Sequence, residues 1–214
     1  MTVGGGDSTG MSGSARIYLV RHGRTVMNAE VRFRGRLEVP LDAVGRAEAL
    51  AVARRLSDAG LAAASQLERV DDAEGLTNLD YGVWEGLTKE ECAAHDPDAF
   101  RLYAEEPERA VCPDGEALAV AADRVVETLR EIGMRHPGES IAAVTHGAMV
   151  RLAVLRIAGP TIGDWQFKLP TGSATVFEVS DNEVRLVSPL DRFRPDPHKA
   201  AAATVDDSPE AVAS

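Results

Sequence analysis

Two short runs of consecutive apolar residues mark the chain, and each leads into a histidine. Residues 17–20 (IYLV) are followed by Arg21 and His22, and residues 141–144 (IAAV) are followed, one residue later, by His146. Apolar runs of this length are typical of strands that are buried on both faces of a sheet. We therefore predict two central strands that end at polar loops.

Apolar residues at helical spacing predict the helices around these strands. One helix is expected over residues 42–59, where Asp42 can act as the N-cap and Val44 and Leu50 share an apolar stripe. A short helix is expected over residues 89–94. The remaining elements are a long helix over residues 116–134, a helix over residues 149–158, and a hairpin of strands over residues 175–179 and 184–187.

The alternation of strands and helices predicts the α/β class. We expect a three-layer αβα sandwich with a mostly parallel central sheet and helices on both faces. Residues 16–190 are expected to form this one domain, since a chain of 214 residues suits a single core. Residues 1–15 are rich in Gly and Ser and residues 195–214 in Ala, Asp and Pro, so we predict a disordered N-terminal tail and a loose C-terminal tail.

The net negative charge of the chain excludes some classes of binding partner. The chain has 23 Lys and Arg against 34 Asp and Glu, a net charge of −11, which disfavours nucleic acid and anionic membranes as partners. An anionic substrate must then be bound by a local basic pocket. No apolar stretch approaches the ~20 residues of a membrane-spanning helix, the polar N-terminus has no secretory signal pattern, and the two cysteines have no metal-type spacing. These features predict a cytoplasmic protein.

The strand ends carry the candidate chemistry. Ligands of open α/β sheets bind beyond the carboxyl ends of the strands, so His22 and His146 would meet there if their strands are neighbours. With Arg21 beside them they would form an anion pocket suited to phosphate. A histidine at a strand end can also be an ordinary loop residue. Four further arginines in the following loop are either solvated or an entrance that attracts anions: Arg24, Arg32, Arg34 and Arg36.

An ordered set of motifs makes the prediction more specific. The stretch IYLVRHGRTVMNAEVRFRGRLEVPLDAVGRAEA, the later LDYGVWEGLT and PDGEALAVAADRV, and then AAVTHGAMVRLAV follow one another along residues 16–187. This set resembles the histidine phosphatase superfamily, the phosphoglycerate mutase-like clan.

The resemblance implies roles for individual residues. His22 would attack phosphorus and become a phosphohistidine, Arg21 and Arg69 would bind the transferring phosphoryl group, and His146 would donate hydrogen bonds to its oxygens. Arg69 could equally be a surface residue. Further substrate contacts would come from three positions, Asn28, Gly23 and Gly147.

The sequence departs from the family pattern in two places. Asn78 stands where the family has a Glu that protonates the leaving oxygen, and an amide has no proton to transfer. Asp80 and Glu85 are nearby carboxylates that could substitute. After Arg69 the chain runs through residues 71–74 directly into the next motif, so one helix and one strand of the usual fold are expected to be missing.

We therefore expect a metal-independent phosphatase that hydrolyses small phosphomonoesters through phospho-His22, with no cofactor and no bound metal. A neutral imidazole, whose ordinary pKa is ~6.5, is a competent nucleophile at neutral pH. One alternative is a phosphoglycerate mutase, which would return the phosphoryl group to its substrate. The other is a weakly active or inactive member that only binds phosphorylated metabolites.

Overall fold

A four-stranded mixed sheet forms the centre of the molecule. The computed structural model describes residues 13–61, 73–159 and 165–187, and within them the strand order is β2-β1-β3-β4. β1 pairs in parallel with β2 and antiparallel with β3, and β3 pairs antiparallel with β4. The strands are β1 (Ala15–Arg21), β2 (Ser140–Thr145), β3 (Ala174–Ser180) and β4 (Glu183–Leu186).

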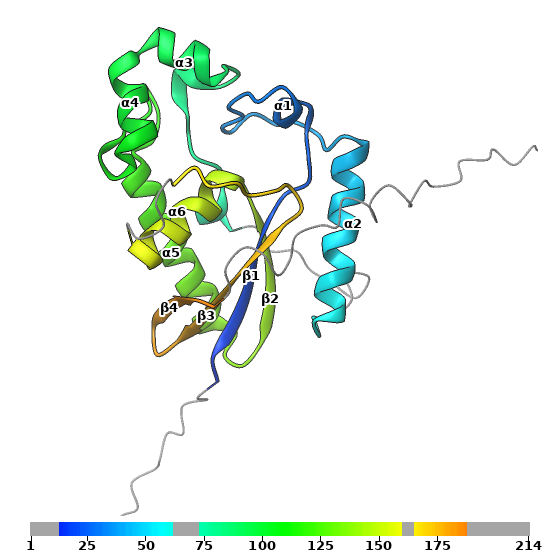
Figure 1. Cartoon of the computed structure of the whole chain (residues 1–214). Helices are drawn as coiled ribbons and strands as arrows, with labels where there is room; N and C mark the ends of the chain where they lie inside the picture. The colour runs from blue at the N-terminus through cyan, green and yellow to red at the C-terminus, as the bar shows by residue number, and fades with distance from the viewer. Residues whose placement is uncertain (1–12, 62–72, 160–164, 188–214) are drawn as a thin grey trace, which may run out of the picture.

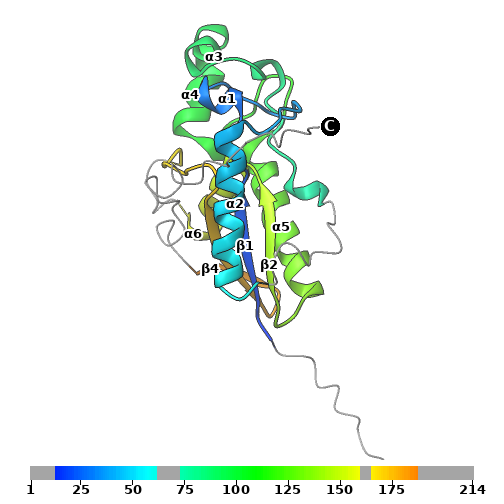
Figure 2. The same ribbon diagram turned by 90° about the vertical axis from the view of Figure 1, so that its right-hand side faces the viewer.

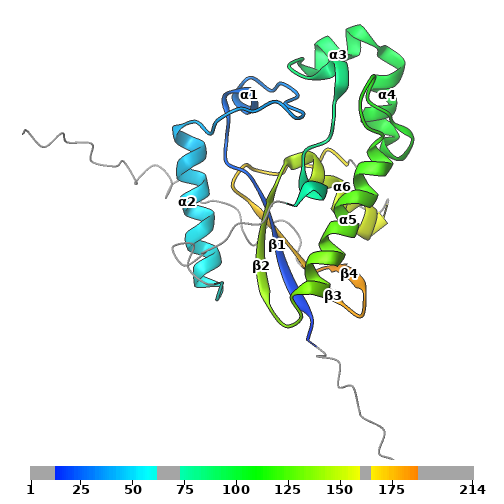
Figure 3. The same ribbon diagram turned by 180° about the vertical axis from the view of Figure 1, so that it is seen from behind.

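Helices cover both faces of the sheet and complete three layers. α2 lies against one face and α5 and α6 against the other (Figure 1), and the side view and the back view show the same layers (Figures 2 and 3). The expected α/β sandwich is thus confirmed. The helices are α1 (Val26–Ala29), α2 (Ala43–Asp58), α3 (Lys89–His95), α4 (Pro97–Glu105), α5 (Leu118–Arg135) and α6 (Gly147–Ala158), with 3₁₀ turns at Glu74–Leu76, Gly82–Trp84 and Pro107–Arg109.

The apolar run of β1 is buried on both faces, as predicted. Ile17 and Leu19 belong to the large apolar cluster that includes α5 and α6, while Tyr18 and Val20 pack with Leu56 of α2 in a second, smaller cluster. Alternate residues of a strand point to opposite faces, so this one strand joins both cores. Because β1 is central, its carboxyl end is held firmly in place.

The sheet is less parallel than predicted. Among the described strands only β1 and β2 run parallel. The segment after α6 returns to the carboxyl end of β1, where Gly172 N donates to Arg21 O at 3.1 Å, so β3 can only run back along β1 in the opposite direction. The predicted hairpin of β3 and β4 is confirmed, and its turn has Asp181 and Asn182 at φ 49° and 64°.

The helices differ from the predicted ones in detail. α5 buries the predicted face, but α2 turns Val52 and Leu56 toward the sheet and leaves Val44 and Leu50 exposed. Pro97 does not only end α3: it is the first residue of α4, which Asp96 caps by accepting from Ala99 N. Proline is favoured at the first helical position because its missing N–H has no partner there anyway.

An aromatic cluster supports the loops beyond the carboxyl ends of the strands. Trp84 is fully buried, and its ring lies 5.6 Å from that of Tyr103 and 6.2 Å from that of Phe33. Tyr103 in turn contacts Trp165 at 5.0 Å and Tyr81 at 6.2 Å. The cluster joins the loop after α1 to α4 and to the chain after α6, and its members form part of the wall of the cavity described below.

Several predictions fall on parts of the chain that the structure does not describe. The two tails lie mostly in residues 1–12 and 188–214, although Ala15 already belongs to β1, and Arg69 lies within residues 62–72. From residue 73 to Asn78 the chain forms one 3₁₀ turn and no longer element. The prediction of a second central strand is wrong for the described sheet: β2 is an edge there, and Val144 on its uncovered face is 65% exposed. No described helix has the length and apolar character needed to cross a membrane.

Candidate active site

The two histidines meet at the carboxyl ends of β1 and β2. Arg21 is in register with Thr145 in the parallel pair, and His22 N donates to Thr145 O at 2.9 Å. The residue that follows each strand is therefore a histidine. The ring centroids of His22 and His146 lie 5.0 Å apart, and the ring planes make an angle of 63°. The strands are neighbours, so the expected convergence of the two imidazoles is confirmed.

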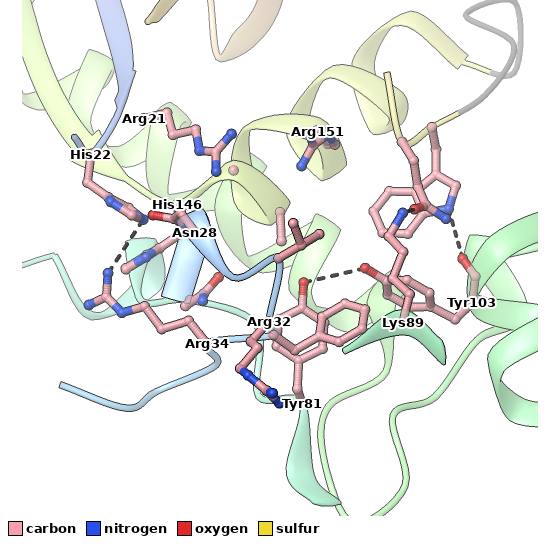
Figure 4. Close-up of a pocket in the computed structure, with 17 residues that line it drawn as sticks. Arg21, His22, Asn28, Arg32, Arg34, Tyr81, Lys89, Tyr103, His146 and Arg151 are labelled. Atoms are coloured by element: carbon pink, nitrogen blue, oxygen red, sulfur yellow. Dashed lines mark hydrogen bonds between the residues drawn. The ribbon is translucent and has the colours of Figure 1, made fainter. Parts of the chain in front are cut away.

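One ring nitrogen of His22 is available for chemistry. Its Nδ1 lies 2.7 Å from Gly23 O. A carbonyl oxygen can only accept, so Nδ1 carries the proton and Nε2 keeps the lone pair. Nε2 faces the side chain of Arg34, whose Nη1 lies 3.4 Å away (Figure 4). The backbone thus selects the tautomer in which Nε2 is nucleophilic.

Both imidazoles are neutral at physiological pH. Burial, with the nearby charges of Arg34 and Arg21, lowers the pKa of His22 to about 4, although the bond to Gly23 O acts in the opposite direction. Burial and the neighbouring His22, Arg34 and Arg21 lower the pKa of His146 to about 3. His22 therefore stays neutral and keeps its Nε2 lone pair at pH values well below the ordinary histidine pKa of ~6.5.

This electrostatic environment predicts an unusual titration. In ¹⁵N spectra of the histidine side chains, the rings assigned to His22 and His146 will stay neutral as the pH falls to 5.5, and His22 will gain a proton only near pH 4. Between about pH 6.5 and 4 the unfolded chain binds protons at these rings and the folded protein does not, so stability will fall as the pH falls through that window. Assignment by His22→Gln and His146→Gln spectra is the control, and titration of either ring near pH 6.5 would contradict the prediction.

Arg21 sits beside the histidines with its charge intact. Its Nη1 donates to Leu169 O. Its Nε is buried and has no hydrogen-bond partner among the described residues. Burial and the nearby charge of Arg151 lower the pKa of Arg21 to about 10, which leaves the guanidinium protonated at neutral pH. Such a group is suited to binding phosphoryl oxygens.

Four cationic side chains line the cavity that the sequence does not identify as specific candidates. Arg32 and Arg34 stand only in the general loop cluster, and neither Arg151 nor Lys89 is among the predicted site residues. Arg151 could have been found, because it lies four residues after Gly147, the first residue of α6, and residues four apart share one face of a helix. The position of Lys89 depends on the fold alone.

A cavity of about 280 Å³ joins these groups. In Figure 4, Arg21, His22, His146 and Arg34 gather at one end, and Lys89 lies at the other beside Tyr103. No Asp or Glu of the described residues lines this cavity. Among all the residues that the structure describes, no group of three or more His, Cys, Asp or Glu is arranged to hold a metal ion.

The predicted substrate contacts have different environments. Asn28 lines the cavity, but its Oδ1 accepts from Thr25 N and Oγ1 at 3.0 and 3.1 Å as part of the cap of α1. Gly147 also lines the cavity. Gly23 is not among the lining residues, and it packs so tightly on Gly45 that an added Cβ would lie 2.1 Å from Gly45 O. A glycine is therefore needed at this position for the close approach of α2, while its backbone oxygen sets the tautomer of His22.

The position of the expected general acid is buried at the cavity. Asn78 is 7% exposed, and its Nδ2 donates to Gly35 O at 2.8 Å. The two carboxylates that could have substituted point elsewhere: Asp80 Oδ1 accepts from Gly82 N at 2.9 Å, and Glu85 Oε1 accepts from Arg36 N at 2.8 Å. Neither lines the cavity, because a local turn hydrogen bond holds Asp80 and a long-range bond to the backbone of Arg36 holds Glu85.

Comparison with known proteins agrees with this arrangement. The family model of the histidine phosphatase superfamily (branch 1) matches residues 17–73 and 59–192. The chain belongs to the histidine phosphatase superfamily. Its relatives include metal-independent phosphoserine phosphatase of Arabidopsis thaliana, 30% identical over 78% of this chain and 77% of that protein, and phosphoserine phosphatase 1 of Hydrogenobacter thermophilus, 26% identical over 86% and 99%.

A solved structure supports the same conclusion for the superfamily's fold. YhfR of Bacillus stearothermophilus superposes with a TM-score of 0.72 at 28% identity, over 83% of this chain and 97% of that one. Phosphoglycerate mutase-like protein 4 of Arabidopsis thaliana is 32% identical over 79% of this chain and 81% of that protein. The chain is thus a histidine-phosphatase-type enzyme, as the order of its motifs indicated.

Proposed function

We propose that this superfamily member hydrolyses small phosphomonoesters without a metal ion, with His22 as the nucleophile. The observation that carries the proposal is the tautomer of His22: Nδ1 donates to Gly23 O, and the unprotonated Nε2, which accepts a long bond of 3.4 Å from Arg34 Nη1, faces the cavity. A buried, neutral imidazole with an oriented lone pair and cations beside it is arranged for attack on a phosphoryl group.

In the first step, His22 Nε2 forms a bond to phosphorus and the bond from phosphorus to the ester oxygen breaks. The electron pair of the broken bond remains on the departing oxygen. Arg21 and Arg34 stabilise the charge on the three remaining phosphoryl oxygens, and neutral His146 donates a ring N–H to one of them. Arg69 is a further candidate for this role from residues 62–72.

In the second step, water attacks the phosphohistidine. The bond from phosphorus to Nε2 breaks, inorganic phosphate leaves, and the ring of His22 regains its lone pair. The two transfers replace one difficult substitution with two easier ones. Asn28 and Gly147 lie close enough to the cavity to contact the bound phosphate.

The cavity and the overall charge support a small phosphorylated metabolite as the substrate. About 280 Å³ accommodates a metabolite of a few heavy atoms beyond its phosphate, and the cationic lining attracts it into a protein of net charge −11. We extend the proposal to a cytoplasmic enzyme that binds neither nucleic acid nor membranes. Cys92 and Cys112 are both buried free thiols, which suits a reducing compartment.

Labelling will test the proposal. Incubation of the full chain with a ³²P-labelled aryl phosphate, followed by rapid quenching, will give an acid-labile, base-stable phosphoenzyme, and peptide mapping will locate the label at His22. Label on any other residue, or none during turnover, would refute His22 as the nucleophile.

A phosphoglycerate mutase uses the same chemistry but must protect the phosphoenzyme from water. With 3-phosphoglycerate, release of inorganic phosphate supports the phosphatase, and interconversion of isomers without release supports the mutase. Phosphate ligands that raise the melting temperature, without any turnover, would indicate a binding protein instead.

A further inference from the structure

The amide of Asn78 has one possible orientation. Gly35 O can only accept, so the atom 2.8 Å from it is Nδ2, and one of the two N–H groups of Nδ2 is already used. Asn78 is 7% exposed, and its Oδ1 has no hydrogen-bond partner among the described residues. The side chain at this position therefore offers a departing oxygen no proton to accept, only a hydrogen bond from the second N–H of Nδ2.

This matters most for alkyl phosphates. Their leaving oxygen departs as an alkoxide, whose conjugate acid is about as weak as water, with a pKa of ~15.7. Without a proton such a group leaves slowly, and general acid catalysis is typically worth ~10²–10⁴ in rate. A leaving group that is stable as an anion does not need the proton.

The wall of the cavity that runs from Gly147 toward Lys89 provides positive charge for such an anion. Arg21 Nε and Arg151 Nη1 lie 3.0 and 3.2 Å from the point where a Cβ on Gly147 would be, so the absence of a side chain there allows both guanidinium groups to approach the same space. Lys89 lies farther along the cavity, and its Nζ donates to the neutral amide of Gln166 (Figure 4). A departing group that moves away from His22 along this wall stays next to cations.

We propose that the preferred substrates are phosphoanhydrides, in which the transferred phosphoryl group is attached to a second phosphate. This inference rests on the proposed function and names its substrate class. The second ionisation of a phosphate has a pKa near ~6, so a phosphate leaves as an anion at neutral pH without a proton donor. Arg151 and Lys89 stabilise its charge in place of the missing acid.

The reaction balances without a further reactant. His22 Nε2 donates its lone pair to the terminal phosphorus, and the bond from that phosphorus to the bridging oxygen breaks. The electron pair stays on the bridging oxygen, which becomes an oxygen of the released phosphate. Water then cleaves the phosphohistidine, so each turnover consumes one water and one anhydride bond.

Three substrates test the inference in a buffer with a metal chelator. Inorganic pyrophosphate is the anhydride, 3-phosphoglycerate is an alkyl monoester that also carries a second anionic group, and p-nitrophenyl phosphate reports the phosphatase activity itself. We expect kcat/KM for pyrophosphate to exceed that for 3-phosphoglycerate at least about 100-fold. Turnover of p-nitrophenyl phosphate with equal rates on the other two would overturn only this inference. No turnover of any of them would overturn the proposed function as well.

A pair of identical substitutions tests the distal cations. Lys89→Gln will lower kcat/KM for pyrophosphate about tenfold more than that for p-nitrophenyl phosphate, since one charge-assisted contact to the leaving phosphate is lost. Lys168→Gln changes an exposed lysine outside the cavity in the same way and will alter neither rate. An equal loss on both substrates in Lys89→Gln would contradict a role for Lys89 at the leaving group.

Discussion

Replacement of His22 by alanine will lower kcat/KM for p-nitrophenyl phosphate at least about 10⁴-fold, because loss of a covalent nucleophile removes the two-step path altogether. The variant will also form no phosphoenzyme. The substitution leaves the strand pairing of β1 untouched, since His22 contributes to it through its backbone N–H to Thr145 O. Initial rates over a range of substrate concentrations measure the effect.

The matched control is His136→Ala. His136 lies at the end of α5, away from the cavity, and its Nδ1 is 3.3 Å from Glu139 Oε2. This variant will keep the wild-type rate within about twofold. Thermal unfolding of both variants separates loss of chemistry from loss of fold. A His22→Ala protein that folds normally and keeps more than a tenth of the activity would show that another group attacks phosphorus.

Replacement of Asn78 by glutamate will raise kcat/KM for 3-phosphoglycerate about 10²-fold or more, because it places a carboxylic acid at the cavity. Burial raises the pKa of a carboxyl group, so the new side chain will hold the proton that a leaving alkoxide needs. The rate on p-nitrophenyl phosphate will change little, since a nitrophenolate leaves without protonation.

Asn78→Gln is the control for shape. It has the length of glutamate and no transferable proton, so it will leave the rate on 3-phosphoglycerate at the wild-type value. If both variants behave alike on alkyl phosphates, the amide at position 78 does not limit the reaction and the acid must come from elsewhere in the chain.

Local sequence patterns predicted those elements whose environment depends on few neighbours. The buried apolar run of β1, the stripe of α5 and the turn of the β3–β4 hairpin all appear as expected, whereas β2 forms where it was expected but is buried on one face only. Local sequence patterns gave wrong predictions where one pattern fitted two structures. Pro97 was interpreted only as a stop and also begins α4, and the weak amphipathic pattern of α2 pointed to Leu50, which is 59% exposed.

The candidate site was predicted in part. Two strands that each end at a histidine brought His22 and His146 together once the strands proved to be parallel neighbours. Arg34 reaches His22 from a loop whose path depends on packing of Phe33 against Tyr81, at 4.6 Å between ring centroids. No periodicity in the sequence specifies such a contact, because it joins segments far apart along the chain.

The class of fold, the order of the motifs, the family and the two histidines follow from the amino-acid sequence alone, since they depend on hydrophobic pattern and on residue type. The antiparallel position of β3, the tautomer and lowered pKa of His22, and the placement of Arg34, Arg151 and Lys89 around one cavity depend on how the chain packs. These features arise from burial and from non-local contacts, and both exist only after the layers have packed.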